Sequence, residues 1–126
     1  MILGLGCDLI EIARVEKAAR EERFLVRTFT EEERRQSGGN MAFLAGCFAV
    51  KEAVVKCFGT GFRGIEPAEI EVLRDALGKP YVRLSGAAAA RCAAFGGQTP
   101  LVSISDTRTH AMAVAVFERE DGGETK

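Results

Sequence analysis

The chain of 126 residues is 47% hydrophobic and 28% charged, which predicts one globular domain large enough to bury its own core. Its 17 Lys and Arg against 18 Asp and Glu exclude a global basic field for nucleic acid but leave local basic patches open. No Trp and one Tyr argue against a row of stacking platforms for bases. We expect the domain to span residues 1–118, with residues 119–126 as a frayed polar tail.

Hydropathy and cysteine usage both favour a cytoplasmic protein. The longest uncharged run, residues 36–50, is shorter than the ~20 residues of a membrane span, and no signal-peptide pattern begins the chain. With no CxxC spacing and His110 as the one histidine, a zinc site would need scattered ligands. Apolar or small neighbours predict reduced, buried thiols at Cys7, Cys47, Cys57 and Cys92. We therefore expect a reducing cytoplasm and no membrane partner.

The first predicted element is a strand over Met1–Cys7, in which Gly4 and Gly6 permit close backbone approach. A partial apolar stripe predicts a helix over Leu9–Arg20, and Arg23–Phe29 is expected to form another helical turn.

Two helices with clear end signals follow. Thr30 and Glu33 form a capping-box pattern at the start of a short helix, which residues 37–40 end. The central helix is expected over Met41–Phe58, with Gly59 as its C′ residue.

Turn signals divide the second half of the chain into shorter elements. We expect strands over Ile70–Arg74 and Tyr81–Leu84, an Ala-rich helix capped by Ser85 and reaching Phe95, and a strand pair Leu101–Ser105 and Ala111–Phe117. The fold class is α+β: a single domain with a mainly antiparallel sheet packed on the long central helix.

Glu52 and Lys56 of the central helix lie about 40° apart on one helical face. A stabilising surface pair, worth roughly 0.2–0.5 kcal/mol, is one explanation of that spacing. The helix is apolar on nearly every face before Lys51, however, and burying charges is costly unless they are paired or bind a ligand. The alternative is a binding site.

Asp8 is the second acidic candidate. Alone, an acid after a strand often caps the next helix. Paired in space with Glu52, it would form a site for Mg²⁺, which usually takes one or two protein carboxylates and completes its octahedron with water and phosphate oxygens. Lys56 would then offset the charge that develops on a leaving phosphate.

Two further features have both a structural and a functional explanation. Gly59, Thr60 and Gly61 follow a helix C-terminus, whose partial negative charge excludes a phosphate cradle, so they form a C-cap or a bare rim for a ligand. Asp106 either starts a hairpin turn or points to the face of Val102 and Ile104.

Four arginines recur among acids early in the chain. Mixed charges of this kind usually mark a solvated face. The arginines are Arg14, Arg20, Arg23 and Arg27.

Taken together, several motifs resemble the holo-[acyl-carrier-protein] synthase family of 4′-phosphopantetheinyl transferases. They cover nearly the whole chain in the family's order: Gly4-Leu5-Gly6-Cys7-Asp8-Leu9, Arg14, Arg23-Phe24, Phe43-Leu44-Ala45-Gly46, Phe48-Ala49-Val50-Lys51-Glu52-Ala53, Lys56, Gly59-Thr60-Gly61 and Val102-Ser103-Ile104-Ser105. The resemblance implies an enzyme that moves the 4′-phosphopantetheine arm of coenzyme A to a serine of apo acyl carrier protein and releases 3′,5′-ADP. It also implies a homotrimer with sites between subunits.

Residue roles follow from the same resemblance. Asp8 and Glu52 would hold Mg²⁺, Glu52 would be the base for the serine hydroxyl, and Lys56 would neutralise the leaving phosphate. Candidate coenzyme contacts are Lys51, Lys56, Gly59, Thr60, Gly61 and Asp106, and candidate carrier contacts are Arg14 and Arg23.

Three departures from the family pattern predict weaker coenzyme affinity. Cys47 stands where many members have Arg, Asp106 where many have His, and residues 36–40 lack basic side chains, for which Arg34 and Arg35 are candidate substitutes. Two other functions stay open: a non-enzymatic coenzyme A or nucleotide-binding module, which would not need Glu52 and Lys56 together, and a structural trimerisation domain.

Overall fold

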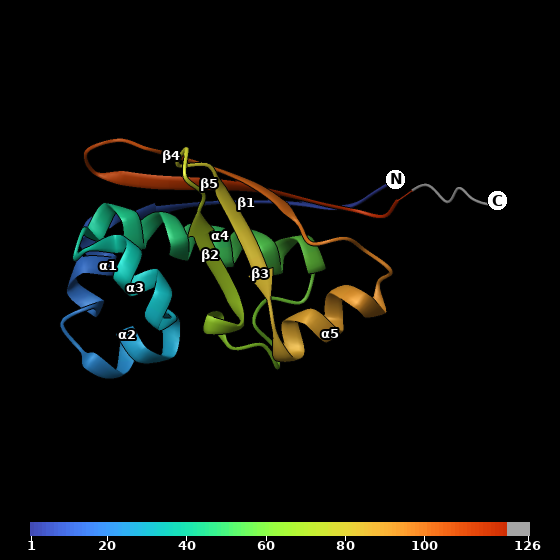
Figure 1. Ribbon diagram of the computed structural model, residues 1–126, viewed down its shortest axis with the longest axis horizontal. Helices are drawn as coiled ribbons and strands as arrows, with labels where there is room; N and C mark the ends of the chain where they lie inside the picture. Colours follow the sequence, from blue (N-terminus) through green and yellow to red (C-terminus); the bar gives the residue numbers. More distant parts are fainter. Residues whose placement is uncertain (121–126) are drawn as a thin grey trace.

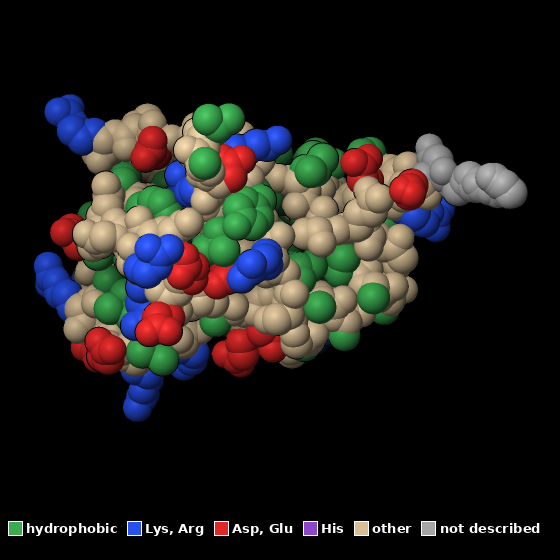
Figure 2. Space-filling view, in the orientation of Figure 1, with side chains coloured by type: hydrophobic (Ala, Val, Ile, Leu, Met, Phe, Trp, Pro, Cys, Tyr) green, Lys and Arg blue, Asp and Glu red, His purple; other side chains and the backbone are tan. Residues whose placement is uncertain are grey.

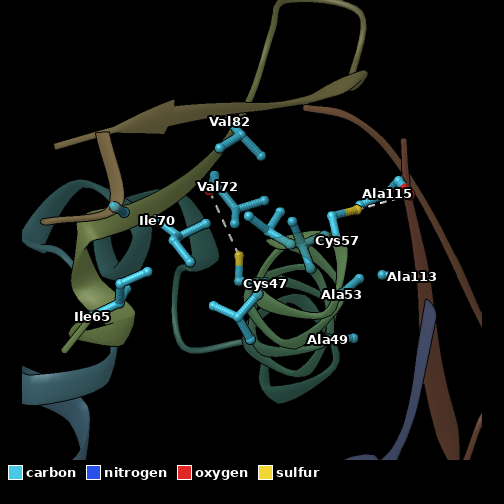
Figure 3. Packing of buried hydrophobic residues seen from close by; sticks show 14 of the residues in the cluster. Cys47, Ala49, Ala53, Cys57, Ile65, Ile70, Val72, Val82, Ala113 and Ala115 are labelled. Atoms are coloured by element: carbon cyan, nitrogen blue, oxygen red, sulfur yellow. Dashed lines mark hydrogen bonds between the residues drawn. The ribbon is translucent and has the colours of Figure 1, made fainter. Parts of the chain in front are cut away.

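A computed structural model describes residues 1–120 and contains two antiparallel sheets on opposite sides of one long helix (Figure 1). The larger sheet has the order β1-β5-β4 and the smaller pairs β2 with β3. Their bounds are β1 (Ile2–Glu11), β2 (Ile70–Arg74), β3 (Pro80–Leu84), β4 (Leu101–Asp106) and β5 (His110–Glu118). Between the sheets lies α4 (Met41–Phe58), which Figure 3 shows end-on, with β2 on one side and β5 on the other.

The remaining helices cover the ends of this arrangement. Three short helices lie beside the N-terminal half of α4, at the left of Figure 1, and α5 lies beyond its other end. Their bounds are α1 (Ile12–Ala18), α2 (Glu22–Thr28), α3 (Glu31–Ser37) and α5 (Gly86–Ala94), and the 3₁₀ helix η1 (Pro67–Glu69) leads into β2. No helix within residues 1–120 has both the length and the apolar character needed to cross a bilayer.

Small residues let the larger sheet approach α4 closely. In β5, every second residue faces the helix, and Ala111, Ala113 and Ala115 are fully buried. Figure 3 shows Ala113 and Ala115 on the side of β5 that faces α4. In β1, a Cβ atom at Gly4 would overlap the backbone carbonyl of Cys57, and one at Gly6 would overlap that of Ala53. The two glycines therefore permit backbone-to-backbone contact where β1 crosses α4.

Most predicted elements are confirmed. The central helix has the predicted bounds, and Gly59 ends it in the left-handed region with φ 76°. Thr30 and Glu33 form the expected capping box, with both reciprocal hydrogen bonds present. The α+β class, with a mainly antiparallel sheet packed on a long helix, is confirmed as well.

The N-terminal boundary was predicted wrongly. Strand β1 continues to Glu11, because residues 8–11 pair with residues 110–113 of β5, and the helix begins at Ile12 in place of Leu9. Asp8 therefore lies inside a strand and does not cap the next helix.

The Ser85 side chain makes no capping hydrogen bond to α5. The backbone N–H of Ala88 instead donates to Oε1 of Glu69 at 3.3 Å, so a carboxylate from η1 takes over that function.

The C-terminal boundary is only partly described. The backbone N–H of Arg119 donates to the carbonyl of Met1 at 2.9 Å, so backbone pairing with the N-terminus continues past residue 118. Residues 121–126, which make up most of the expected tail, lie outside the described residues, and the division at residue 118 stays a prediction.

All four cysteines lie within the described residues and are free thiols. Burial raises the pKa of Cys47 to about 12 and that of Cys57 to about 11, and their thiols contact the carbonyls of Val72 and Ala115 (Figure 3). Cys92 is also buried, but Cys7 is exposed, contrary to expectation, because its side chain lies on the outer face of β1.

Candidate active site

The crossing of β1 over α4 brings Asp8 and Lys56 together. Asp8 follows Gly6 by two residues and so lies on the strand face that contacts the helix. The Lys56 ammonium donates to the carbonyl of Cys7 at 2.9 Å and lies 3.1 Å from Oδ1 of Asp8. Lys56 thus forms its ion pair with Asp8, across the crossing. The i,i+4 spacing suggested a surface pair with Glu52, but Asp8 and the Cys7 carbonyl hold the Lys56 ammonium instead.

Glu52 lies half-buried beside this pair. Its pKa is raised above the usual value, first by burial and then by the negative charge of Asp8, while the Lys56 ammonium lowers it. Each of these charges therefore acts on the Glu52 carboxyl, although the two acids come from elements 44 positions apart in the chain.

Glu52 also marks the place where two clefts meet. The first, of about 430 Å³, is lined by Asp8, Leu9, Ile10, Arg14, Val15, Ala18, Phe24, Phe48 and Glu52. The second, of about 440 Å³, is lined by Phe24, Arg27, Thr28, Phe48, Glu52, Phe62, Ile65, Glu66 and Pro67. The shared wall consists of Phe24 and Phe48, whose ring centroids are 6.3 Å apart, and of Glu52. A reacting group beside Glu52 is therefore reachable from two sides.

The donor set at this place suits a hard divalent cation that keeps open positions. Asp8 and Glu52 both line the first cleft and present carboxylate oxygens. Within residues 1–120, no group of three or more His, Cys, Asp or Glu side chains is arranged to hold a metal. Mg²⁺ usually takes one or two protein carboxylates and leaves its other coordination positions to water and substrate oxygens, whereas structural zinc takes four protein ligands. Two carboxylates at this place therefore fit Mg²⁺ better than structural zinc.

The Gly59-Thr60-Gly61 segment lies at the end of α4, roughly 10 Å along the helix axis from Glu52 at 1.5 Å per residue. Apart from the adjoining backbone, no atom of the described residues lies within 4 Å of the place where a Cβ at Gly59 or Gly61 would be, so the backbone is bare there. Arg91 Nη1 donates to Oγ1 of Thr60 at 2.8 Å. The segment thus forms an open rim apart from both clefts.

The other candidate residues are distributed around this centre. Arg14 is exposed and lines the first cleft, whereas Arg23 is exposed on α2 outside the lining of either cleft. Charged side chains of both signs cover the α1–α3 end of the molecule in Figure 2, as the mixed-charge pattern predicts. Asp106 ends β4 in a separate hollow of about 90 Å³ beside Leu9 and His110.

Lys51 requires a correction. The family resemblance implied that it binds the coenzyme, but its side chain is fully buried. Its ammonium bonds both carboxylate oxygens of Glu33, at 2.8 and 3.0 Å, and the carbonyls of Pro67 and Ile70, at 3.1 and 2.6 Å. With its three donors engaged inside the protein, Lys51 does not reach a ligand in the clefts.

Sequence reasoning missed the aromatic wall of Phe24 and Phe48. Phe48 precedes Glu52 by four residues, so the face that carries Glu52 and Lys56 could have been extended to it. Phe24 comes from α2 and meets Phe48 only through the tertiary fold.

Comparison with known proteins identifies the family. A family model described as the 4′-phosphopantetheinyl transferase superfamily matches residues 4–115. The chain belongs to this superfamily. Similar transferases include the holo-[acyl-carrier-protein] synthase of Lachnoclostridium phytofermentans, 48% identical over 94% of this chain and 97% of that protein.

Solved transferase structures share the fold. The holo-[acyl-carrier-protein] synthase from Neisseria meningitidis superposes with a TM-score of 0.86 at 33% identity, covering 94% of this chain and 100% of the other. The synthase from Bacillus anthracis, solved in complex with coenzyme A (3′,5′-ADP), has a TM-score of 0.79 at 35% identity, covering 95% and 99%. The predicted family and fold are both confirmed.

Proposed function

We propose that this chain is a holo-[acyl-carrier-protein] synthase. It transfers the 4′-phosphopantetheine arm of coenzyme A to a serine of apo acyl carrier protein and releases 3′,5′-ADP. The observation that carries the proposal is the convergence of Asp8, Glu52 and Lys56 at the β1–α4 crossing of a phosphopantetheinyl transferase. A non-enzymatic coenzyme A module would not need both a base such as Glu52 and the Lys56–Asp8 pair at one place.

The reaction breaks a phosphoanhydride bond of coenzyme A and forms a phosphodiester bond to the carrier serine. The serine oxygen bonds to the phosphorus that carries the pantetheine arm, the bond from that phosphorus to the bridging oxygen of the pyrophosphate breaks, and the bridging oxygen leaves on 3′,5′-ADP. Asp8 and Glu52 would hold Mg²⁺, which supplies positive charge to the pyrophosphate.

Glu52 takes the proton of the serine hydroxyl. In the metal-free chain burial raises the pKa of this carboxyl, and a more basic carboxylate is a better proton acceptor. Lys56, held by the Cys7 carbonyl and by Asp8, keeps an ammonium at the crossing, where it offsets the charge on the departing phosphate.

Carrier and coenzyme approach from different directions. Arg14 lies on the first cleft and Arg23 on the neighbouring exposed face, so an acidic carrier would dock there and present its serine to Glu52. Gly59, Thr60 and Gly61 offer the coenzyme a bare backbone rim.

The working form is a homotrimer in the cytoplasm. The outer face of the larger sheet is apolar and unpartnered in the single chain: Leu5 is 68% exposed, Leu9 67% and Leu101 62%. Burial of this face between copies would stabilise an oligomer. Asp106, which lies outside both clefts of its own chain, is then available to a neighbouring copy's coenzyme. Free thiols suit a reducing compartment.

The test is direct. The protein is incubated with Mg²⁺, coenzyme A and an apo acyl carrier protein, and the carrier is weighed by mass spectrometry. Addition of the phosphopantetheine mass is expected with wild type and not with Glu52→Gln, with excess chelator, or with a carrier whose acceptor serine is alanine. Coenzyme A binding without any mass gain on several carriers would instead favour the non-enzymatic module.

A further inference from the structure

A buried ion pair that the proposed reaction does not use lies behind the active site. Glu33 and Lys51 are both fully buried. Glu33 accepts from the backbone N–H of Thr30 at 2.7 Å and of Val72 at 2.8 Å, in addition to Lys51. Together with the bonds from Lys51 to the carbonyls of Pro67 and Ile70, the pair ties together α3, α4, η1 and β2.

Stability alone is a weak explanation of this pair. Removing two charges from water carries a large desolvation penalty, and well-packed apolar residues in place of a buried pair are often neutral or stabilising. Apolar side chains flank the pair on both elements: Val50 and Val54 of α4 and Ile70 and Val72 of β2 are fully buried. Unlike apolar packing, the pair also fixes how α4 is oriented relative to its neighbours, since each of its hydrogen bonds restricts an angle as well as a distance.

The pair is linked to the active site through the rotation of α4. Lys51 and Glu52 are adjacent, so their side chains leave the helix about 100° apart. Lys51 enters the core toward β2, and Glu52 lies where the two clefts meet. Anchoring Lys51 at four acceptor atoms fixes where Glu52 points. Pro67, whose carbonyl Lys51 bonds, also lines the second cleft with Glu52.

We propose that Glu33 and Lys51 are positioning residues that orient Glu52 for the transfer reaction. This role rests on the function proposed above. Neither residue touches substrate. They act by fixing the rotation of α4 about its own axis relative to β2 and η1.

The test separates orientation from stability. In Lys51→Met the aliphatic stem remains and the ammonium is lost. We expect kcat per folded molecule to fall about tenfold to a hundredfold, as a displacement near 1 Å at a reacting group can cause. The KM values for coenzyme A and carrier, and coenzyme A affinity by calorimetry, should stay within about threefold of wild type. Amide exchange of η1 and early β2 should become faster.

A matched control and a second variant keep the outcome decisive. Val82→Ala removes a buried apolar side chain from β3 and should lower the melting temperature while leaving kcat unchanged. If Lys51→Met alone does not fold, Glu33→Leu combined with Lys51→Met leaves no uncompensated charge and should still lower kcat.

An active wild type with wild-type kcat in either Lys51 variant would overturn the positioning role alone. A wild type that loads no carrier would overturn the proposed function and this role with it.

Discussion

At the scale of single residues, the site depends on how one carboxyl is surrounded. Glu52 has no unusual chemistry of its own; burial and the negative charge of Asp8 raise its pKa, and Lys56 opposes them. A carboxylate made more basic at a point reachable from two clefts is suited to take a proton from an incoming hydroxyl.

The opposite effects of the two neighbours on Glu52 can be measured. In metal-free protein followed by carboxyl NMR titration, Asp8→Asn should lower the pKa of Glu52, because a repelling charge is removed, and Lys56→Met should raise it, because an attracting charge is removed. Glu16→Gln, at an exposed site on α1, serves as the control and should shift nothing. Shifts of the same sign in the two active-site variants would contradict this arrangement.

A divalent cation at the site opposes the same shift. Positive charge beside the carboxyl favours its ionised form, so adding Mg²⁺ to the metal-free protein should lower the pKa of Glu52 in the NMR titration, whereas the titration of Glu16 should not change.

At the scale of elements, the proposed function depends on one crossing and one exposed helical segment. The glycines of β1 let the strand contact the backbone of α4 and thereby place Asp8 beside Lys56. The α1–α2 segment carries exposed arginines beside the first cleft.

Gly6→Ala tests the crossing. The added Cβ would overlap the Ala53 carbonyl, a backbone atom that cannot rotate away, so β1 must move relative to α4. We expect a loss of about 1–3 kcal/mol in the free energy of unfolding by urea denaturation, together with a fall in turnover. Cys7→Ala, on the opposite face of the same strand, should change both little. Equal stability of the two variants would show that the crossing is not close-packed.

Arg14→Glu tests the carrier face. Reversing a rim charge acts mainly on association, so the KM for the carrier should rise about tenfold, equivalent to ~1.4 kcal/mol, with coenzyme A affinity unchanged. Raising salt to physiological strength, where the Debye length is ~8 Å, should bring wild type closer to the variant. Lys79→Glu makes the same charge change at the exposed β2–β3 turn and should behave as wild type. Unaltered carrier kinetics across the salt series would leave Arg14 as a merely solvated residue.

At the scale of the whole molecule, the single chain exposes an apolar sheet face and keeps Asp106 away from the clefts. Both observations are explained if copies associate through the outer face of the β1-β5-β4 sheet and complete one another's sites.

Leu5→Glu tests this association. Placing a charge on the outer face, where Leu5 is 68% exposed, should convert a trimer to monomers in sedimentation analysis and remove most turnover while the monomer stays folded. Leu77→Glu, at a site 96% exposed on the β2–β3 turn, should leave assembly and turnover unchanged. A Leu5→Glu variant that remains trimeric, or a fully active monomer, would contradict the proposed assembly.

The sequence by itself determined the features that depend on neighbours along the chain. The bounds of α4, its glycine C-cap, the Thr30–Glu33 capping box and the two hairpins follow from local hydrogen bonds and backbone preferences. The family motifs also named the three residues that meet at the crossing.

Tertiary structure decided the rest, because the deciding partners lie far away in the chain. Pairing with β5 carried β1 through Asp8 to Glu11, although the local pattern favoured a helix there. Lys51 was drawn into the core by Glu33, whose local signal was only that of a helix cap. Phe24, on α2, packs against Phe48 of α4 and so lines the first cleft together with Glu52. A buried charge takes whichever partner the fold brings within hydrogen-bonding distance, and spacing along one helix does not reveal that partner.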